Sequence, residues 1–319
     1  MDEFRLIDAI RRVVRGPADS RVRIGIGDDA ALLAVPSGQV VATTDALVEG
    51  VHFRFDLCRP ADVGWKAAAV NLSDIAAMGA RPLALLAAIE VPAALPDRAV
   101  VAAMRELSRA GAAHGAPVVG GNVSAGPVFV MTVTALGEPV NGRVLTRSGA
   151  RGGDIILSGG FLGSGSLGLD LLESHPEWTR RFPALARAYR RPAAQVGLGL
   201  GLAALPGVHA LIDVSDGLVA DIGHVCAASG VGALLDAQRI PFHPEARRYA
   251  RLTGRDALDA ALSGGDDYRL LAVAEPSTAP LCEALGMTAI GRITARRGVL
   301  VTSDGVRVTV AGAGGWRHR

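Results

Sequence analysis

The stretch ADVGWKAAAVNLSDIAAMGARPLALLAAIEVP, residues 61–92, contains two hydrophobic patterns in succession. Its first part, residues 61–80, is rich in alanine, with Asp62 near its start and Gly79 near its end, which predicts an α-helix. Its second part, residues 81–92, is an apolar run that is predicted to form a buried strand. A helix followed directly by a buried strand indicates a fold in which both element types alternate.

The alternation continues on both sides of this stretch. Further strands are predicted at residues 39–47, in two runs within 117–139, and at 210–218, 268–275, 299–303 and 306–312. An amphipathic helix is predicted at residues 96–116, a glycine-rich loop leads into a helix after residue 158, and another helix starts near Val219. Turn-forming residues gather at 141–150, where we place a domain boundary. The chain is therefore predicted to have an α/β (α+β) fold with two domains, residues 1–145 and 146–319.

The composition is that of a globular protein without a strong charge. The chain has 319 residues, of which 50% are hydrophobic and 4% aromatic, and its formal net charge is +2. This length is sufficient for two domains with real cores. The weak charge gives no electrostatic reason to expect nucleic acid as a partner. Lys66 is the only lysine, which excludes any mechanism that needs another one.

Several features indicate a cytoplasmic protein. Its three cysteines are far apart in the sequence and lack metal-type spacing, which is typical of a reducing compartment. The N-terminal stretch MDEFRLIDAIRRVVRG predicts a short amphipathic helix and lacks the apolar core of a signal peptide. The apolar stretch at residues 83–91 is too short to span a bilayer. We therefore expect no membrane partner.

Aspartates recur where apolar segments end, mostly beside Gly, Ser or Thr. They are Asp28, Asp29, Asp45, Asp74, Asp213, Asp216, Asp266 and Asp267. Oxygen ligands of this kind are preferred by Mg²⁺, although a single Asp beside Gly or Ser is more often a turn or a helix cap. Asp74 differs because it lies inside an alanine-rich helix, where Asp is a poor helix former. Asn71 is on the same helix face, so Asp74 is a candidate functional residue.

The neighbouring carboxylates of Asp28 and Asp29 repel each other and resist burial. A cation near at least one of them, or exposure of both to water, would relieve this repulsion. The two residues by themselves leave both possibilities open.

Other motifs narrow the chemistry. The glycine-rich segments at 120–126, 158–168 and 263–267 offer backbone N–H groups that suit phosphate, although glycine also serves turns. No Walker-type motif occurs, and the dinucleotide-like segment GSGSLG lacks the expected downstream acid. His52 is by itself more often structural, and no nucleophile is evident. Phosphoryl transfer needs none, since positioning and charge neutralisation carry that reaction.

Seven motifs follow one another along the chain: GIGDDAALL, TTDALVEGVHF, NLSDIAAMGARP, GGNVSAGP, LTRSGARGGD, DVSDGL and ALSGGDDY. Taken together, they resemble the motifs of the thiamine-monophosphate kinase family, within the aminoimidazole-ribonucleotide-synthetase-like superfamily. They extend from about residue 24 to residue 291. The segments TRSGA and SGGDDY favour this kinase over other members of the superfamily.

The resemblance implies a fold, an assembly and a reaction. It implies a two-domain subunit and a homodimer, in which the mixed sheets of the N-terminal metal- and ATP-binding domains pair into a barrel-like interface. The C-terminal α/β domain would complete the active site. The implied reaction transfers the γ-phosphoryl group of ATP directly to thiamine monophosphate, giving thiamine diphosphate, with several Mg²⁺ ions neutralising the two phosphate chains.

The resemblance also implies roles for individual residues. Metal ligands would be Asp29, Thr43, Thr44, Asp45, Asp74, Asn122, Asp213 and Asp216, with Asp28 behind them. Nucleotide contacts would come from Gly121, Asn122, Arg147 and Ser215, and Arg147 suits this role because guanidinium binds phosphate bidentately. Contacts with the thiamine substrate would come from His52, Asp266 and Trp316.

The chain departs from the family pattern at four positions. Asn122 and Val123 stand where the family has Asp and Thr, Ala46 where it often has Thr, and Asp266 where it usually has Glu. Asn122 keeps a ligating oxygen but loses a charge, so it would hold Mg²⁺ more weakly. Two alternatives therefore stay open: another ATP-dependent kinase or synthetase of the superfamily, and a nucleotide-binding homologue with weakened catalysis.

Overall fold

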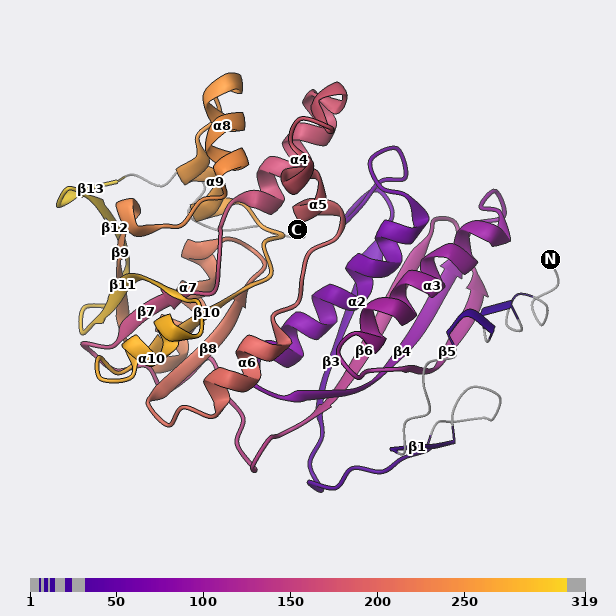
Figure 1. Cartoon of the computed structure of the whole chain (residues 1–319), viewed down its shortest axis with the longest axis horizontal. Coiled ribbons are helices and arrows are strands. Elements are labelled where there is room, and N and C mark those ends of the chain that lie inside the picture. Colours follow the sequence, from indigo (N-terminus) through magenta and orange to yellow (C-terminus); the bar gives the residue numbers. More distant parts are fainter. Residues whose placement is uncertain (1–5, 7–8, 11, 15–20, 25–31, 309–319) are drawn as a thin grey trace. The chain divides into compact units, whose positions relative to one another are not determined.

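The computed structural model describes residues 6, 9–10, 12–14, 21–24 and 32–308. The chain divides into two compact units: Met1–Ile75 with Ala80–Gly142, and Ala76–Gly79 with Arg143–Arg319. Each unit contains its own sheet and helices, as Figure 1 shows. The predicted α/β class is confirmed, since both units mix strands and helices.

The first unit is built on a four-stranded sheet. Its strands and helices are β1 (Val22–Ile24), β2 (Leu32–Leu33), β3 (Val41–Val48), α2 (Pro60–Ala77), β4 (Arg81–Val91), α3 (Asp97–Ala112), β5 (Val118–Ala125) and β6 (Val130–Glu138). The strand order is β3-β6-β4-β5, in which β4 and β5 are parallel and the other pairs antiparallel. The helix and strand predicted for residues 61–92 are confirmed as α2 and β4.

The helices α2 and α3 lie over one face of this sheet (Figure 1). Residues Met131, Val133 and Ala135 of β6 alternate along the strand and are fully buried. Thr132 and Thr134, between them, point to the opposite face and are only partly buried. This two-residue period is the one expected of a strand with one face on a core. One face of the sheet is therefore covered by helices, and the other face carries side chains that are only partly buried.

Glycine permits an unusually close approach of α2 to α3. A Cβ atom at Gly64 would lie 1.8 Å from the carbonyl oxygen of Ala103 in α3. Only a residue without a side chain fits there, so Gly64 fixes the distance at which α2 packs on α3.

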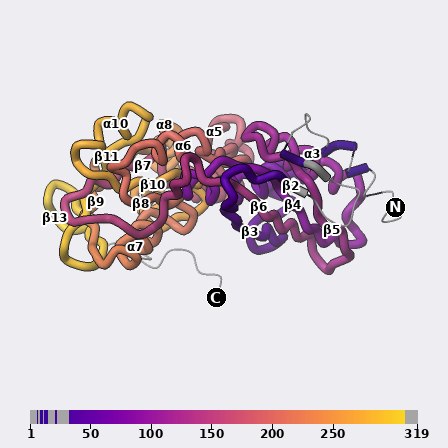
Figure 2. The backbone as a smooth tube through the Cα atoms, turned by 90° about the horizontal axis from the view of Figure 1, so that it is seen from below, coloured from indigo at the N-terminus to yellow at the C-terminus, as the bar shows by residue number. Residues whose placement is uncertain are grey.

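The second unit is built on a seven-stranded sheet. Its elements are β7 (Ile155–Ser158), α4 (Ser164–Ser174), η1 (Pro176–Trp178), α5 (Pro183–Arg190), α6 (Val196–Ala203), β8 (Val208–Val214), α7 (Leu218–Ser229), β9 (Gly232–Asp236), η2 (Ala237–Arg239), α8 (Pro244–Thr253), α9 (Ala257–Ser263), β10 (Arg269–Ala274), α10 (Ala279–Ala284), β11 (Thr288–Thr294), β12 (Gly298–Ser303) and β13 (Val306–Arg307). The order is β13-β12-β9-β11-β7-β10-β8, and only β9 and β12 pair in parallel. Figure 2 follows this chain path as a tube.

The sheet order of the second unit brings three loops to one sheet end. Strand β10 lies antiparallel between β7 and β8. The residues that follow β7, those that follow β8 and those that precede β10 are therefore neighbours. These loops carry the glycine-rich segment 158–168, the DVSDGL motif and the SGGDDY motif.

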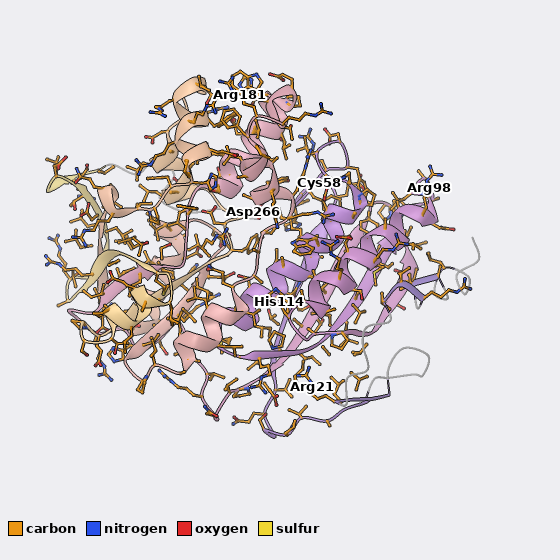
Figure 3. All side chains as sticks on the ribbon, in the orientation of Figure 1. Arg21, Cys58, Arg98, His114, Arg181 and Asp266 are labelled. Atoms are coloured by element: carbon orange, nitrogen blue, oxygen red, sulfur yellow. The ribbon has the colours of Figure 1, made fainter. Side chains whose placement is uncertain are left out.

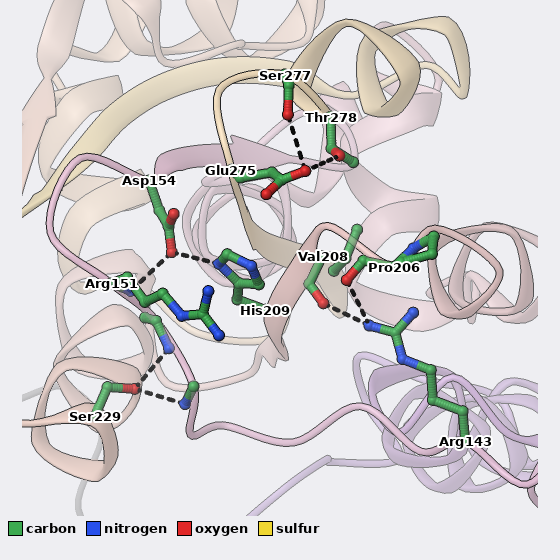
Figure 4. Close-up of polar contacts among 12 residues, drawn as sticks. Arg143, Arg151, Asp154, Pro206, Val208, His209, Ser229, Glu275, Ser277 and Thr278 are labelled. Carbon is green, nitrogen blue, oxygen red and sulfur yellow. Dashed lines mark hydrogen bonds and ion pairs between the residues drawn. The ribbon is translucent and has the colours of Figure 1, made fainter.

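The opposite end of the same strands is closed by internal hydrogen bonds (Figure 4). Asp154, immediately before β7, is 4% exposed. Its carboxylate accepts the backbone N–H of Arg151 at 2.7 Å and contacts Nδ1 of His209 at 2.9 Å. Glu275, just after β10, accepts the hydroxyl protons of Ser277 and Thr278. These acids have protein partners and serve the fold.

The segment that enters the second unit is fixed by Arg143 (Figure 4). Its guanidinium donates to the carbonyl oxygens of Ala203, Leu205 and Val208 at 3.0, 2.8 and 2.7 Å. One arginine thus caps the end of α6 and holds the turn that leads into β8. The same interaction places the following TRSGA segment beside β8.

Three further features considered in the sequence can be compared with the structure. Leu6, Ile10 and Val14 are buried at intervals of four, as the amphipathic N-terminal helix requires. Cys58, Cys226 and Cys282 are all buried free thiols. Among the helices that the structure describes, none is both long and apolar enough to cross a membrane.

Candidate functional site

In the first unit, helix α2 holds the edge strand β3 through two polar side chains. Asn71 and Asp74 lie one turn apart and face β3. The carboxylate of Asp74 accepts the hydroxyl proton of Thr43 at 2.6 Å. The side-chain oxygen of Asn71 accepts the backbone N–H of Asp45 at 3.0 Å. The structure therefore brings Thr43, Asp45 and Asp74 together, as the sequence motifs predict.

Asn71 is the fixed member of this group. It is fully buried, and its amide group donates to the carbonyl oxygen of Ala67 in the preceding turn at 2.9 Å. Both ends of its side chain are thereby used, so its orientation is defined. Asp74 is only half-buried and Asp45 is exposed, so both carboxylates can be reached from solvent. Sequence reasoning treated Asn71 only as a neighbour of Asp74, and the i, i+3 spacing was the available signal.

The side chain of Thr44 lies on the opposite face of the sheet. Its hydroxyl is 3.1 Å from the carbonyl oxygen of Val133 and 3.1 Å from the hydroxyl of Thr134. Adjacent residues of a strand point to opposite faces, so the side chains of Thr43 and Thr44 do not converge.

Asn122 lies on the strand at the other edge of the sheet. In β5 it is paired with Ala88, which pairs in turn with Thr132, whose partner in β3 is Ala46. Three strand spacings of about 4.8 Å therefore separate Asn122 from β3. Within one copy of this unit, Asn122 does not join the group around Asp74. It is exposed on the sheet face opposite the helices.

Gly121 occupies a position that excludes every other residue type. A Cβ atom there would lie 2.0 Å from the carbonyl oxygen of Ala87 in the neighbouring strand. The residue is also exposed. Its backbone can therefore approach a ligand closely, which is consistent with the nucleotide contact expected there.

His52 is held in one orientation by the turn that follows β3. Its Nδ1 accepts the backbone N–H of Val48 at 3.1 Å. The backbone N–H of His52 in turn donates to the carbonyl oxygen of Val48. A neutral imidazole that accepts at Nδ1 carries its proton at Nε2. His52 is half-buried. Its Nε2 is thus defined as a hydrogen-bond donor.

In the second unit, the DVSDGL loop follows β8 and is organised by an acid that sequence reasoning missed. The backbone N–H groups of Ser215, Asp216 and Gly217 all donate to one oxygen of Asp221, each at 3.1 Å. Asp221 is 2% exposed. Burial, and next the charges of Asp213 and Asp216, raise its pKa to about 8.

The acids of this loop form a set that suits a cation. Asp213 is buried and Asp216 half-buried beside Asp221. Ligand atoms of Asp216, Asp221 and His224 lie within 4.8 Å of one another. Carboxylate oxygens are the donors that Mg²⁺ prefers, and packing three acids together is unfavourable without positive charge. The carboxylates of Asp213 and Asp216 therefore suit the expected metal, with Asp221 behind them. The spacing of acids in DVSDGLVADIGH was the signal that could have identified Asp221.

The SGGDDY loop is paired with this loop through its backbone. The N–H of Asp266 donates to the carbonyl oxygen of Ser215 at 2.9 Å, and that of Tyr268 to the carbonyl oxygen of Val214 at 2.8 Å. Asp266 has a φ angle of 67°, in the left-handed region that is unfavourable for a residue with a side chain. Its carboxylate accepts the hydroxyl proton of Tyr268 at 2.8 Å. Asp266, labelled in Figure 3, is therefore held in a defined position beside Ser215.

Asp267 ties the glycine-rich segment to the same loops. Its buried carboxylate accepts the N–H groups of Gly163 and Gly165, at the start of α4, at 2.5 and 2.9 Å. Burial raises its pKa to about 7, opposed by these hydrogen bonds. In the sequence, segment 158–168 is one of three glycine-rich segments whose N–H groups suit phosphate. These two N–H groups instead bind a side chain of the protein.

Arg147 is exposed in the segment that runs beside β8. The carbonyl oxygen of Thr146 accepts the N–H of Leu211 at 2.9 Å. The N–H groups of Gly149 and Ala150 donate to the hydroxyl of Ser229. The backbone on both sides of Arg147 is thus anchored, while the side chain is open to solvent. Three predicted site residues, Asp28, Asp29 and Trp316, lie outside the described residues.

Known families and proteins match this chain over most of its length. The chain matches the family model of the AIR synthase related protein, N-terminal domain, over residues 27–138, and that of the C-terminal domain over residues 151–303. It is 39% identical to the thiamine-monophosphate kinase of Mycobacterium tuberculosis over 274 residues, which cover 85% of this chain and 80% of that protein.

Solved structures give the same result. The thiamine-monophosphate kinase of Stenotrophomonas maltophilia has a TM-score of 0.81 and 38% identity, covering 97% of this chain and 98% of its own. The structure of AaThiL complexed with AMPPCP and TMP has a TM-score of 0.81 and 34% identity, covering 99% and 97%. The predicted two-domain fold is thereby confirmed. The chain belongs to the thiamine-monophosphate kinase family and is a phosphotransferase.

Proposed function

We propose that this protein phosphorylates thiamine monophosphate with ATP, giving thiamine diphosphate and ADP. The observation that carries the proposal is the likeness, over 99% of the chain, to a structure complexed with AMPPCP and TMP. The acidic groups around Asp74 and Asp213 support it, because two phosphate chains can approach each other only where their charge is neutralised.

The chemistry of each side chain indicates the role that it would have in the reaction. Mg²⁺ ions would supply the positive charge that phosphoryl transfer needs. Their ligands would be Asp29, Thr43, Thr44, Asp45, Asp74, Asn122, Asp213 and Asp216. Arg147 would bind a phosphate group of the nucleotide. The backbone at Gly121 and Ser215 would contact the same nucleotide. Because no covalent intermediate is needed, these residues act by positioning the two substrates in line.

The thiamine monophosphate would be oriented by polar groups of defined direction. The Nε2–H of His52 would donate to an acceptor on this substrate. The carboxylate of Asp266, fixed by Tyr268, would accept a hydrogen bond or balance a positive charge. Trp316 would cover the aromatic part of the substrate.

The protein would act as a homodimer in the cytoplasm. The sheet face of the first unit that is not packed against α2 and α3 exposes Thr44, Ala88 and Asn122. We propose that a second copy of the chain packs on this face, in the barrel-like arrangement that the family resemblance implies. The N-terminal domain, residues 1–145, would then provide the dimer interface, and residues 146–319 would complete the site.

A coupled assay of ADP release tests the proposal. Purified protein with ATP and Mg²⁺ should release ADP only when thiamine monophosphate is added, and thiamine diphosphate should form in equal amount. ADP release that is indifferent to thiamine monophosphate would favour a synthetase or another kinase of the superfamily. Tight ATP binding without any turnover would favour the weakened homologue, in which Asn122 has replaced a needed acid.

A further inference from the structure

The loop that carries Asp213 and Asp216 depends on one buried oxygen for its shape. Three consecutive N–H groups, of residues 215–217, point at the same carboxylate oxygen of Asp221. Consecutive N–H groups that converge in this way form a concave site for an anion. Here the acceptor is a carboxyl oxygen of the chain itself, and it comes from the first turn of α7.

The remaining contacts of the loop do not replace this one. The carbonyl oxygen of Ser215 accepts the N–H of Asp266, which binds the loop to its neighbour but leaves the three N–H groups to Asp221. Gly217 has a φ angle of 115°, and a Cβ atom there would lie 2.9 Å from the backbone of Ser263. The turn is therefore closely packed and uses a backbone conformation that only glycine adopts readily.

We propose that Asp221 is a positioning residue for the reaction, which holds the carboxylates of Asp213 and Asp216 at the separation that a divalent cation needs. The inference rests on the proposed function, since it takes Asp213 and Asp216 as metal ligands. Groups that orient metal ligands from behind are commonly worth about 10–100-fold in metal affinity or activity.

The geometry separates this role from direct ligation. One oxygen of Asp221 is committed to the loop N–H groups, and the residue is 2% exposed. His224, the exposed third member of the group of possible ligands, lies one turn further along α7. If Asp221 and His224 bound the metal themselves, removal of the imidazole would weaken metal binding. If Asp221 only positions the loop, His224→Gln has no effect.

Two substitutions at Asp221, with a matched pair elsewhere, test the inference. Asp221→Asn keeps an oxygen that accepts N–H groups, whereas Asp221→Ala removes it. The controls are Asp154→Asn and Asp154→Ala, because Asp154 is also buried in the second unit and also accepts a backbone N–H, but at the other end of the sheet. The readouts are thermal unfolding, Mn²⁺ binding to the nucleotide-free full chain by electron paramagnetic resonance, and the Mg²⁺ concentration that gives half-maximal turnover.

We expect Asp221→Ala to weaken Mn²⁺ binding and raise the Mg²⁺ requirement by about 10–100-fold. Asp221→Asn, whose uncharged oxygen accepts the N–H groups less strongly, should weaken binding by a smaller factor. The Asp154 variants should lower the unfolding temperature but leave Mn²⁺ affinity within about twofold of wild type, since they do not touch the loop.

Unchanged Mn²⁺ affinity in folded Asp221→Ala overturns the inference. If that variant does not fold, unchanged affinity in Asp221→Asn overturns it instead. Weaker binding in His224→Gln, or a wild-type protein that binds no Mn²⁺, also overturns it. Absence of thiamine-monophosphate-dependent ADP release, with the Mn²⁺ differences present, would count against the proposed function alone.

Discussion

Substitution of Gly64 by alanine should disturb the packing on which the group around Asp74 depends. The new Cβ atom would lie 1.8 Å from the carbonyl oxygen of Ala103, which is about 1.6 Å short of the 3.4 Å at which ordinary contact begins. It would also lie 2.6 Å from the carbonyl carbon of the same residue. Because both atoms belong to the backbone of α3, no side chain can move aside, and the two helices must separate.

The expected free-energy change is the difference of two effects. Overpacking of a closely packed core typically costs about 1–3 kcal/mol, and contact with backbone places this site at the upper end. Replacing glycine by alanine in a helix gains about 1 kcal/mol. We therefore expect the free energy of unfolding to fall by about 1–2 kcal/mol. Asp74 lies further along the same helix, so turnover should fall as its contact with Thr43 is displaced.

Gly223→Ala provides the matched control. Gly223 lies inside α7, and a Cβ atom there would have no neighbour within 4 Å. The same substitution should therefore stabilise the protein by about 0.4–1 kcal/mol. Urea unfolding followed by circular dichroism measures both variants, and steady-state ADP release measures turnover. A Gly64→Ala protein as stable and as active as wild type would refute the packing argument.

Three further predictions concern the candidate site. Asp74→Asn should lower turnover by at least about 10–100-fold while the unfolding temperature stays close to wild type, because the amide still accepts from Thr43 but carries no charge; near-full activity would exclude Asp74 as a metal ligand. Asn122→Asp should keep or raise Mg²⁺ affinity, measured as the half-activating concentration, and a large loss of activity would show that the site is adapted to asparagine. The pKa of Asp267 is about 7 in the folded protein, against an ordinary value of 3.8. Between these two pH values the folded state binds more protons than the unfolded state. The free energy of unfolding therefore falls as pH rises through this interval. Urea titrations from pH 4 to 7 should therefore show wild type losing stability relative to Asp267→Asn, and a pH-independent difference would contradict the assignment.

The amino-acid sequence by itself determined the elements and the family. The helix at 61–80, the strand at 81–92 and the strand that ends in DVSDGL follow from local periodicity, glycine and proline, which act over a few residues and can be read without a structure. The motifs that carry the family resemblance are also local, and the comparisons confirmed them over most of the chain.

Only the tertiary structure decided which side chains meet. Thr43 and Asp74 are 31 residues apart, and Asp267 contacts an N–H group 104 residues away. Such contacts depend on sheet order and helix packing, which no local pattern specifies. For the same reason the structure placed Thr44 and Asn122 on the far face of the sheet. It also showed the role of Asp221, whose hydrogen bonds reach only residues 215–217 and which the spacing of acids in the sequence could have indicated.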